Sequence, residues 1–304
     1  MDYILEVSNI TKKYRNTAVL KNLNMQIPKG SIYGFIGKNG AGKTTLIRII
    51  TGLQNPTSGS YKLYGVPHDE KEVLAARRRV GAVVENPALY LDMTAEENLK
   101  QQAIILGLPS FDFIKELLKD VGLDNTGKKK VRTFSLGMKQ RLSIAIALVG
   151  NPDFLVLDEP INGLDPQGIV AIREFLLKLN REKQITILIS SHYLDELSKL
   201  ATYYGFIENG QIVKEISAKE LDRSLRKRTV IRVTDVKVLT QILDELNIQY
   251  EIESNNEAYV YSKFNITELA ILLKEKNCEI ESIRENDESL ESFYVNLVGD
   301  DINA

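Results

Sequence analysis

The chain has 304 residues, of which 43% are hydrophobic and 26% charged. This is the balance of an ordinary folded protein, and it excludes a largely disordered or collagen-like chain. With 39 basic and 41 acidic side chains the formal net charge is -2, so no overall attraction to anionic lipid or nucleic acid is implied, and nucleic acid is not expected as a partner.

The N-terminal two thirds predict a small antiparallel sheet followed by alternating strands and helices. Ile4 to Val7 and Val19 to Ile27 form the antiparallel part, with turn residues near Asn16. Short apolar runs typical of buried strands then follow at Ser31 to Ile36, Val80 to Val84, Phe154 to Leu157, Ile185 to Ile189 and Tyr204 to Ile207. Helical spacing lies between several of them, at Lys43 to Thr51, Ser135 to Val149 and Ile169 to Asn180. This alternation predicts a mainly parallel sheet covered by helices, and Phe111 to Leu118 adds a helical insertion.

The last third predicts a second domain. A basic connecting stretch from Ser217 to Arg228 marks the boundary, and we place the domains at residues 1–222 and 223–304. The expected strands are Val230 to Val233, Tyr250 to Ser254, Ala258 to Lys263 and Cys278 to Arg284, and the expected helices Val236 to Leu246 and Thr267 to Lys276. Their β-α-β-β-α-β order is the ferredoxin-like pattern. A final amphipathic segment runs from Ser289 to Leu297.

The first candidate functional motif is a glycine-rich segment at residues 37–45. It reads Gly-Lys-Asn-Gly-Ala-Gly-Lys-Thr-Thr, fits G-x-x-x-x-G-K-[ST], follows a predicted strand and opens a predicted helix. Its backbone N–H groups are expected to face phosphate oxygens, with Lys43 between the β- and γ-phosphates and Thr44 on Mg²⁺. The candidate nucleotide-binding residues are Gly37, Asn39, Gly40, Ala41, Gly42, Lys43, Thr44 and Thr45. The alternative, a plain strand-to-helix turn, does not require Lys-Thr at this offset.

Two carboxylates close the apolar run that begins at Phe154. Asp158 stands at the carboxyl end of this predicted strand, where it could hold Mg²⁺ beside Thr44. Glu159 is the candidate general base for an attacking water. On its own, an apolar run ending in Asp-Glu is more often a solvated strand end; combined with the phosphate loop it indicates a nucleotide hydrolase.

The segment Phe134-Ser135-Leu136-Gly137-Met138-Lys139-Gln140-Arg141 makes the prediction specific. It resembles the signature of ATP-binding subunits of ABC transporters, usually Leu-Ser-Gly-Gly-Gln, with Ser135 and Gly137 in their expected places. Phe134, Leu136 and Met138 depart from the commonest form. The resemblance implies that Ser135 addresses ATP bound to the opposite subunit of a homodimer; on its own, Ser135 could be a simple helix N-cap.

The same resemblance extends over about residues 3 to 220 and implies further roles. Tyr14 occupies the place of the aromatic that stacks on adenine. Asp165, in Asn162-Gly163-Leu164-Asp165, lies in the loop that crosses the dimer interface. His192 matches the switch histidine that senses the γ-phosphate.

Glu85 departs from the family pattern, which has glutamine after this strand. A carboxylate in Val84-Glu85-Asn86-Pro87 can still ligate Mg²⁺ or order water, but it adds negative charge near the phosphates. Glu85 is therefore a candidate metal ligand and catalytic residue, with a turn acid of no catalytic duty as the alternative. The segment is similar to the branch of bacitracin and lantibiotic export or immunity ATPases, as is the trailing Leu290-Glu291-Ser292-Phe293-Tyr294.

We therefore expect a homodimeric subunit that binds and hydrolyses ATP with Mg²⁺ and energises export through a transmembrane permease. No apolar stretch reaches the roughly 20 residues of a spanning helix, so a separate permease would carry the cargo, and residues Asn86 to Leu99 would line its docking groove. Cys278, the only cysteine, and an N-terminus unlike a secretory signal favour the cytoplasm, with the subunit on the inner membrane face through its partner. Two alternatives are an ABC-type ATPase acting on ribosomes or DNA, and an ATPase whose C-terminal domain is a ligand-binding regulatory module.

Overall fold

The computed structural model describes residues 2–85, 88–225, 228–262, 264–286 and 289–299. The chain divides into two compact units, Met1–Ala218 and Lys219–Ala304. Within the described ranges, no helix combines the length and apolar character that crossing a bilayer requires.

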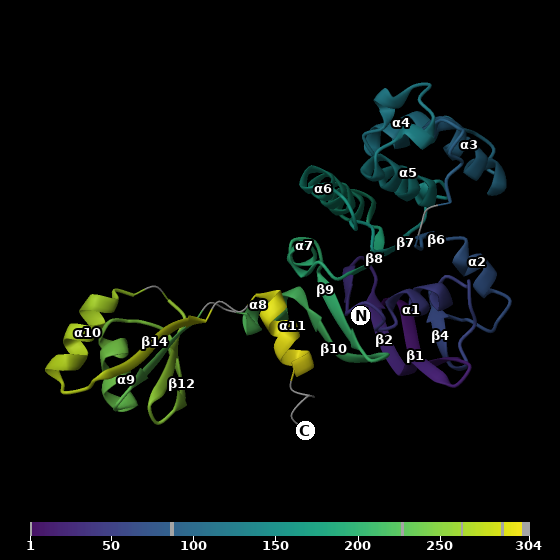
Figure 1. The fold of residues 1–304 in the computed structure, drawn as a ribbon. Helices are drawn as coiled ribbons and strands as arrows, with labels where there is room; N and C mark the ends of the chain where they lie inside the picture. The colour runs from purple at the N-terminus through teal and green to yellow at the C-terminus, as the bar shows by residue number, and fades with distance from the viewer. Residues whose placement is uncertain (1, 86–87, 226–227, 263, 287–288, 300–304) are drawn as a thin grey trace. The chain divides into compact units, whose positions relative to one another are not determined.

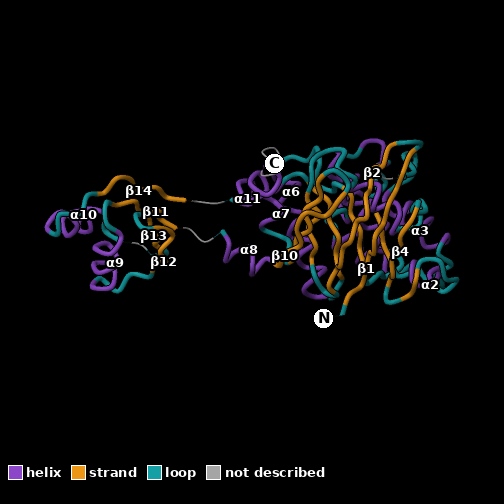
Figure 2. Tube along the Cα trace, turned by 90° about the horizontal axis from the view of Figure 1, so that it is seen from below, coloured by secondary structure: helices purple, strands orange, loops and turns teal. Residues whose placement is uncertain are grey.

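The first unit begins with the antiparallel sheet that the sequence predicts. Its strands are β1 (Tyr3–Tyr14), β2 (Thr17–Pro28), β4 (Ser58–Leu63) and β5 (Val66–Pro67), in the order β2-β1-β4-β5. Leu5 pairs with Ile27 and Val7 with Met25, so apolar side chains of both strands share one face and are buried together. Figures 1 and 2 show this sheet at one side of the unit.

A six-stranded sheet forms the centre of the first unit. Its strands are β3 (Ile32–Ile36), β6 (Val80–Val83), β7 (Phe154–Asp158), β8 (Thr186–Ser191), β9 (Tyr203–Glu208) and β10 (Gln211–Ser217), in the order β10-β9-β3-β8-β7-β6. The neighbours from β9 to β6 pair in parallel, and β10 pairs antiparallel with β9. Every residue of β3, β7 and β8 is buried, as expected of parallel strands covered on both faces.

Helices connect these strands and form the insertion. They are α1 (Lys43–Ile50), α2 (Val73–Arg77), α3 (Ala95–Ile105), α4 (Phe113–Asp120), α5 (Leu136–Leu148), α6 (Pro166–Lys183) and α7 (Leu194–Ser198). Helices α3, α4 and α5 form the insertion between β6 and β7 (Figure 1). Two short 3-10 turns, Asp124–Thr126 and Val131–Thr133, lie between α4 and α5. Helix α3 was not predicted from the sequence, although Thr94 and Glu97 form a capping box at its start.

One apolar core fixes the start of α1. Leu46, Ile47 and Ile50 of α1 lie in the same buried cluster as side chains of both sheets, including Tyr33 and Phe154. The helix is therefore held between the sheets, and the loop that precedes it has a fixed position.

The second unit has the predicted ferredoxin-like topology. Its elements are α8 (Ala218–Ser224), β11 (Arg228–Val233), α9 (Val236–Glu245), β12 (Tyr250–Ser254), β13 (Glu257–Val260), α10 (Ile266–Glu275), β14 (Ile280–Asn286) and α11 (Leu290–Gly299). The sheet order is β12-β13-β11-β14, antiparallel throughout. Residues such as Ile231, Leu239 and Leu269 form a core of its own. The connecting stretch expected from Ser217 to Arg228 is partly helical: α8 occupies Ala218–Ser224.

Candidate functional site

The phosphate loop, residues 37–42, joins strand β3 to helix α1. Gly42 has a φ of 113°, a backbone conformation that is strained for residues with a Cβ atom. At Gly37 the reason for glycine differs, because a Cβ atom would come within 2.6 Å of Ile207. The loop thus turns tightly into the N-terminus of α1, the geometry that favours an anion at the exposed N–H groups.

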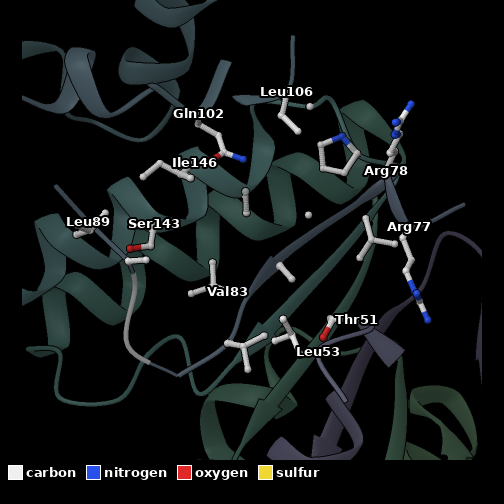
Figure 3. A pocket seen from close by; sticks show the side chains of 18 of the residues that line it. Thr51, Leu53, Arg77, Arg78, Val83, Leu89, Gln102, Leu106, Ser143 and Ile146 are labelled. Carbon is white, nitrogen blue, oxygen red and sulfur yellow. The ribbon is translucent and has the colours of Figure 1, made fainter. Parts of the chain in front are cut away.

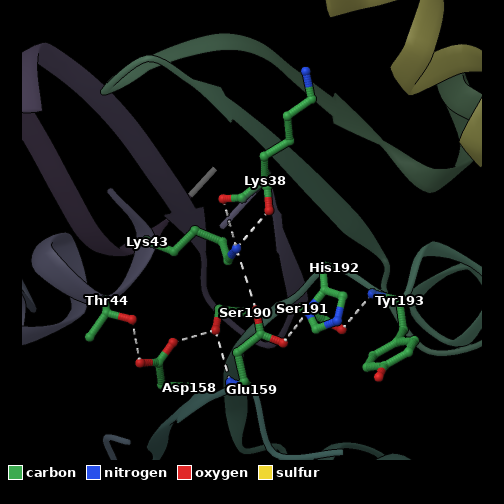
Figure 4. A network of polar contacts seen from close by, with 10 residues as sticks. Lys38, Lys43, Thr44, Asp158, Glu159, Ser190, Ser191, His192 and Tyr193 are labelled. Atoms are coloured by element: carbon green, nitrogen blue, oxygen red, sulfur yellow. Dashed lines mark hydrogen bonds and ion pairs between the residues drawn. The ribbon is translucent and has the colours of Figure 1, made fainter. Parts of the chain in front are cut away.

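Lys43 is buried at the base of this loop, with 6% of its side chain exposed. Its Nζ donates to the carbonyl oxygens of Gly37 at 2.6 Å and Lys38 at 3.3 Å and lies 3.4 Å from Glu159 Oε1. Figure 4 shows the ammonium group between the loop and the acid. A buried positive charge therefore lies between the carbonyl oxygens of the loop and Glu159.

Asp158 is held by two hydroxyl groups at the end of β7. Thr44 Oγ1 donates to Asp158 Oδ2 at 2.7 Å, and Ser190 Oγ donates to Asp158 Oδ1 at 2.6 Å. The aspartate is 4% exposed. The structure therefore brings together two of the three predicted metal ligands, Thr44 and Asp158; the third, Glu85, pairs with Arg48.

The oxygen atoms of Thr44 and Asp158 fit Mg²⁺, which prefers hard oxygen ligands. Within the described residues, no group of three or more Asp, Glu, His or Cys side chains is placed to hold a metal ion.

Glu159 follows β7 and lies between a lysine and a histidine. Its Oε2 is 2.9 Å from His192 Nδ1, and its backbone N–H donates to Ser190 Oγ at 2.9 Å. Its buried Oε1 has no hydrogen-bond partner within the described chain, with Lys43 Nζ at 3.4 Å as its ionic neighbour. The backbone φ of Glu159 is 50°, uncommon for a residue with a long side chain. The strand end thus holds one buried carboxylate oxygen that has an ionic neighbour but makes no hydrogen bond among the described residues.

Glu85 has an arginine as its partner. It follows β6 with a φ of 58°, and one of its carboxylate oxygens contacts Arg48 Nη2 of α1. The hydrogen bond that Arg48 donates to the Glu85 carboxylate is the largest cause that raises the pKa of Arg48 above its usual value. Both side chains are partly exposed, 32% for Arg48 and 54% for Glu85.

The other predicted residues make their hydrogen bonds outside this network. The Tyr14 hydroxyl donates to Gln54 Oε1 at 2.6 Å, and the ring is 42% exposed. Ser135 caps α5 by accepting from Met138 N–H at 3.3 Å, and Asp165 caps α6 by accepting from Gly168 N–H at 3.1 Å.

The signature segment and the segment around Asp165 nevertheless lie beside each other. A Cβ atom added at Gly137 would be 3.5 Å from Leu164, and one added at Gly163 would be 2.8 Å from Leu136. These two predicted dimer-interface segments therefore form one continuous surface.

Sequence reasoning missed Ser190 and Arg48. Ser190 is fully buried and joins Asp158 to the backbone of Glu159 (Figure 4). The signal was a Ser-Ser pair at the end of an otherwise apolar run. Arg48 lies one helical turn after Thr44, but nothing in its local sequence indicates Glu85 as its partner.

A groove with a volume of about 610 Å³ lies between the central sheet and the helical insertion (Figure 3). Leu53, Leu74, Leu89 and Leu106 contribute apolar walls, and Arg77 lies at one side. Of the segment Asn86 to Leu99, which the sequence analysis assigned to such a groove, Ala88 and Leu89 line it. Asn86 and Pro87 lie outside the described residues.

Comparisons with known proteins agree on one family. A family model described as "ABC transporter" matches residues 20–162. The bacitracin transport ATP-binding protein BcrA of Bacillus licheniformis is 40% identical over 98% of this chain and 98% of its own length. The lantibiotic transport ATP-binding protein SrtF of Streptococcus pyogenes is 45% identical over 73% of this chain and 93% of its own length. A solved dimeric ATP-binding cassette in a post-hydrolysis state with ADP and Pi is similar at a TM-score of 0.64 and 27% identity, over 70% of this chain and 98% of that one.

Proposed function

This chain belongs to the ABC transporter family as an ATP-binding subunit, and from this premise we propose that it hydrolyses ATP to drive export of a peptide antibiotic through a separate membrane subunit. The transport activity follows from the family. The cargo class rests on similarity to proteins named for bacitracin and lantibiotic transport.

The position of Glu159 is the observation that carries the hydrolytic mechanism. Its Oε1 is buried, has no hydrogen-bond partner among the described residues and lies 3.4 Å from Lys43 Nζ. We infer that this oxygen accepts a proton from a water molecule as the water oxygen bonds to the γ-phosphorus. The bond from that phosphorus to the bridging oxygen breaks, giving ADP and phosphate. His192, at 2.9 Å from the other oxygen, holds the carboxylate in place.

The remaining site residues bind and orient the triphosphate. Lys43 would exchange its contacts with two loop carbonyl groups for phosphate oxygens, with backbone N–H groups of residues 37–45 around them. Thr44 and Asp158 would hold Mg²⁺, which when bound neutralises charge on the phosphates. Tyr14, at the end of β1, offers an exposed ring for adenine.

We propose that two copies close around ATP. Ser135 and Gly137 of one copy would face the nucleotide held by the phosphate loop of the other, with Asp165 at the interface. The contact between the signature segment and the segment around Asp165 supports this assignment, as does the dimeric solved relative.

The groove of Figure 3 is the proposed contact with the membrane subunit, which would hold this chain at the cytoplasmic face of the membrane. Its apolar walls suit a partner segment with apolar side chains. Val84 lines the groove. It is the residue before Glu85, so the groove and the nucleotide site share one segment of the chain.

The substitution Glu159→Gln tests the mechanism. We expect the variant to bind ATP with Mg²⁺ about as tightly as the wild type but to hydrolyse it at least about a hundredfold more slowly, because the amide cannot take the proton. Phosphate release and binding of a fluorescent ATP analogue measure the two quantities separately.

Lys43→Ala provides the comparison, since it should lose nucleotide binding itself. Normal turnover in Glu159→Gln would show that another group takes the proton. A wild-type chain that binds no nucleotide at all would overturn the proposed function as a whole.

A further inference from the structure

Arg48 lies in the last turn of α1, the helix that follows the phosphate loop, and pairs with Glu85. It lies on α1 one turn beyond Thr44, and residues four apart share a helix face. The helix therefore presents Thr44 toward Asp158 and Arg48 toward the end of β6, where Glu85 stands. Since β6 pairs in parallel with β7, Glu85 and Asp158 belong to the same edge of the sheet.

Glu85 adds a further negative charge at this edge of the sheet, and a cation beside it would offset that charge. Asp158 and Glu159 already supply two carboxylates, and the buried Lys43 ammonium group lies 3.4 Å from Glu159 Oε1. A triphosphate adds several negative charges. An unpaired Glu85 would increase the repulsion, and the energy of such an interaction at short range is comparable to that of a tenfold change in affinity.

The contacts of Arg48 suit it to cancel that charge. Its guanidinium group contacts the Glu85 carboxylate directly. The backbone of Glu85 has a φ of 58°, a sparsely populated conformation for a residue with a Cβ atom.

We propose that Arg48 is a positioning residue of the nucleotide site, which holds Glu85 in an ion pair so that this acid neither repels the triphosphate nor ligates the metal ion. The inference rests on the proposed ATP-binding function. Together Arg48 and Glu85 carry no net charge, as does the glutamine that the family usually has at the position of Glu85.

The test compares nucleotide binding in Arg48→Met, Glu85→Gln and the double variant. Dissociation constants for a fluorescent ATP analogue are measured with Mg²⁺ and, separately, with EDTA, so that the readout does not depend on hydrolysis. Arg48→Met should bind about tenfold more weakly, and by a larger factor in EDTA, where the phosphate charge is not neutralised. The double variant should regain most of this loss, because the acid that needed a partner has gone.

The conservative change Arg48→Lys should keep most of the affinity, since it keeps the charge. Arg232→Met is the matched control: it removes an arginine from another Arg–Glu pair, with Glu257 in the second unit, and should leave nucleotide binding unchanged. Partly exposed ion pairs contribute little to stability, so melting curves should show each variant folded.

Two results would overturn the proposal. If the double variant binds as weakly as Arg48→Met, Arg48 acts on the nucleotide itself or only on the fold. If Glu85→Gln loses affinity with Mg²⁺ but not with EDTA, Glu85 is a metal ligand. Both differ from failure of the proposed function, in which the wild type binds no nucleotide. Should Arg48→Met not fold, the exchanged pair Arg48→Glu with Glu85→Arg, compared with Arg48→Glu alone, gives the same decision through rescue of binding.

Discussion

At the scale of single residues, the sequence predicted the groups whose chemistry is tied to a motif and missed those whose partner is distant in the chain. Lys43, Thr44, Asp158 and Glu159 come together as expected. Ser190 escaped notice because serine at a strand end is common and its partners depend on β8 lying beside β7. The roles of Tyr14, Ser135, Asp165 and His192 remain predictions from the family.

Ser190→Ala should reduce both stability and turnover. The change leaves Asp158 Oδ1 without the Ser190 donor at 2.6 Å, which by the usual range costs about 1–3 kcal/mol for a buried group. Loss of a hydrogen bond behind a metal ligand typically lowers metal affinity or activity by about 10- to 100-fold. Thermal melting and phosphate release measure the two effects.

Ser143→Ala is the matched control, since Ser143 is buried but its hydroxyl donates only to Lys139 O within α5. It should change neither quantity by a comparable amount. Full activity in a folded Ser190→Ala protein would contradict the positioning of Asp158 by Ser190.

At the scale of elements, the apolar runs predicted the buried strands because parallel strands covered on both faces contain few polar residues. The apolar runs could not predict side-chain contacts between two strands that are separated by a third strand. The hydroxyl of Tyr33 on β3 donates to Glu215 Oε1 on β10 at 2.6 Å, passing over β9 between them. A Cβ atom at Gly205 of β9 would lie 2.0 Å from that hydroxyl, so glycine leaves the room for this contact.

Glu215→Gln should stabilise the protein at neutral and alkaline pH. Burial raises the pKa of Glu215, so the carboxyl group contributes stability that is present at low pH and lost as the pH rises through its folded-state pKa. Glutamine does not ionise and keeps an oxygen that can accept from Tyr33 and from Gln26 N–H, as Glu215 does. The melting-temperature difference between variant and wild type, followed against pH, should grow as the pH rises from 4 to 8. A constant difference would contradict this assignment.

At the scale of the whole molecule, the sequence predicted a second folded domain because helix and strand periodicities resume after a basic stretch. The function of that domain does not follow from its topology, since ferredoxin-like folds serve many purposes. The similarity to SrtF extends over 221 residues, close to the length of the first unit, whereas the similarity to BcrA spans nearly the whole chain. The second unit is therefore shared with some relatives and is not common to all.

A fragment of residues 1–218 should bind nucleotide with about the affinity of the full chain. Tyr14, the phosphate loop, Asp158, Glu159 and His192 all lie in the first unit, which has its own core. Titration with a fluorescent ATP analogue measures this, and residues 219–304 alone should melt cooperatively on their own core. A folded 1–218 fragment with markedly weaker binding would show that the second unit contributes to the site.

The left-handed backbone at Glu85 and Glu159, with φ values of 58° and 50°, has an evolutionary consequence. At both positions the left-handed backbone favours glycine or asparagine. Substitutions that stabilise the fold there would therefore replace the two glutamates. Their retention depends on continued use of the protein by the cell. In a lineage that no longer uses the protein, these two positions should be among the first to change, while the surrounding scaffold becomes more stable.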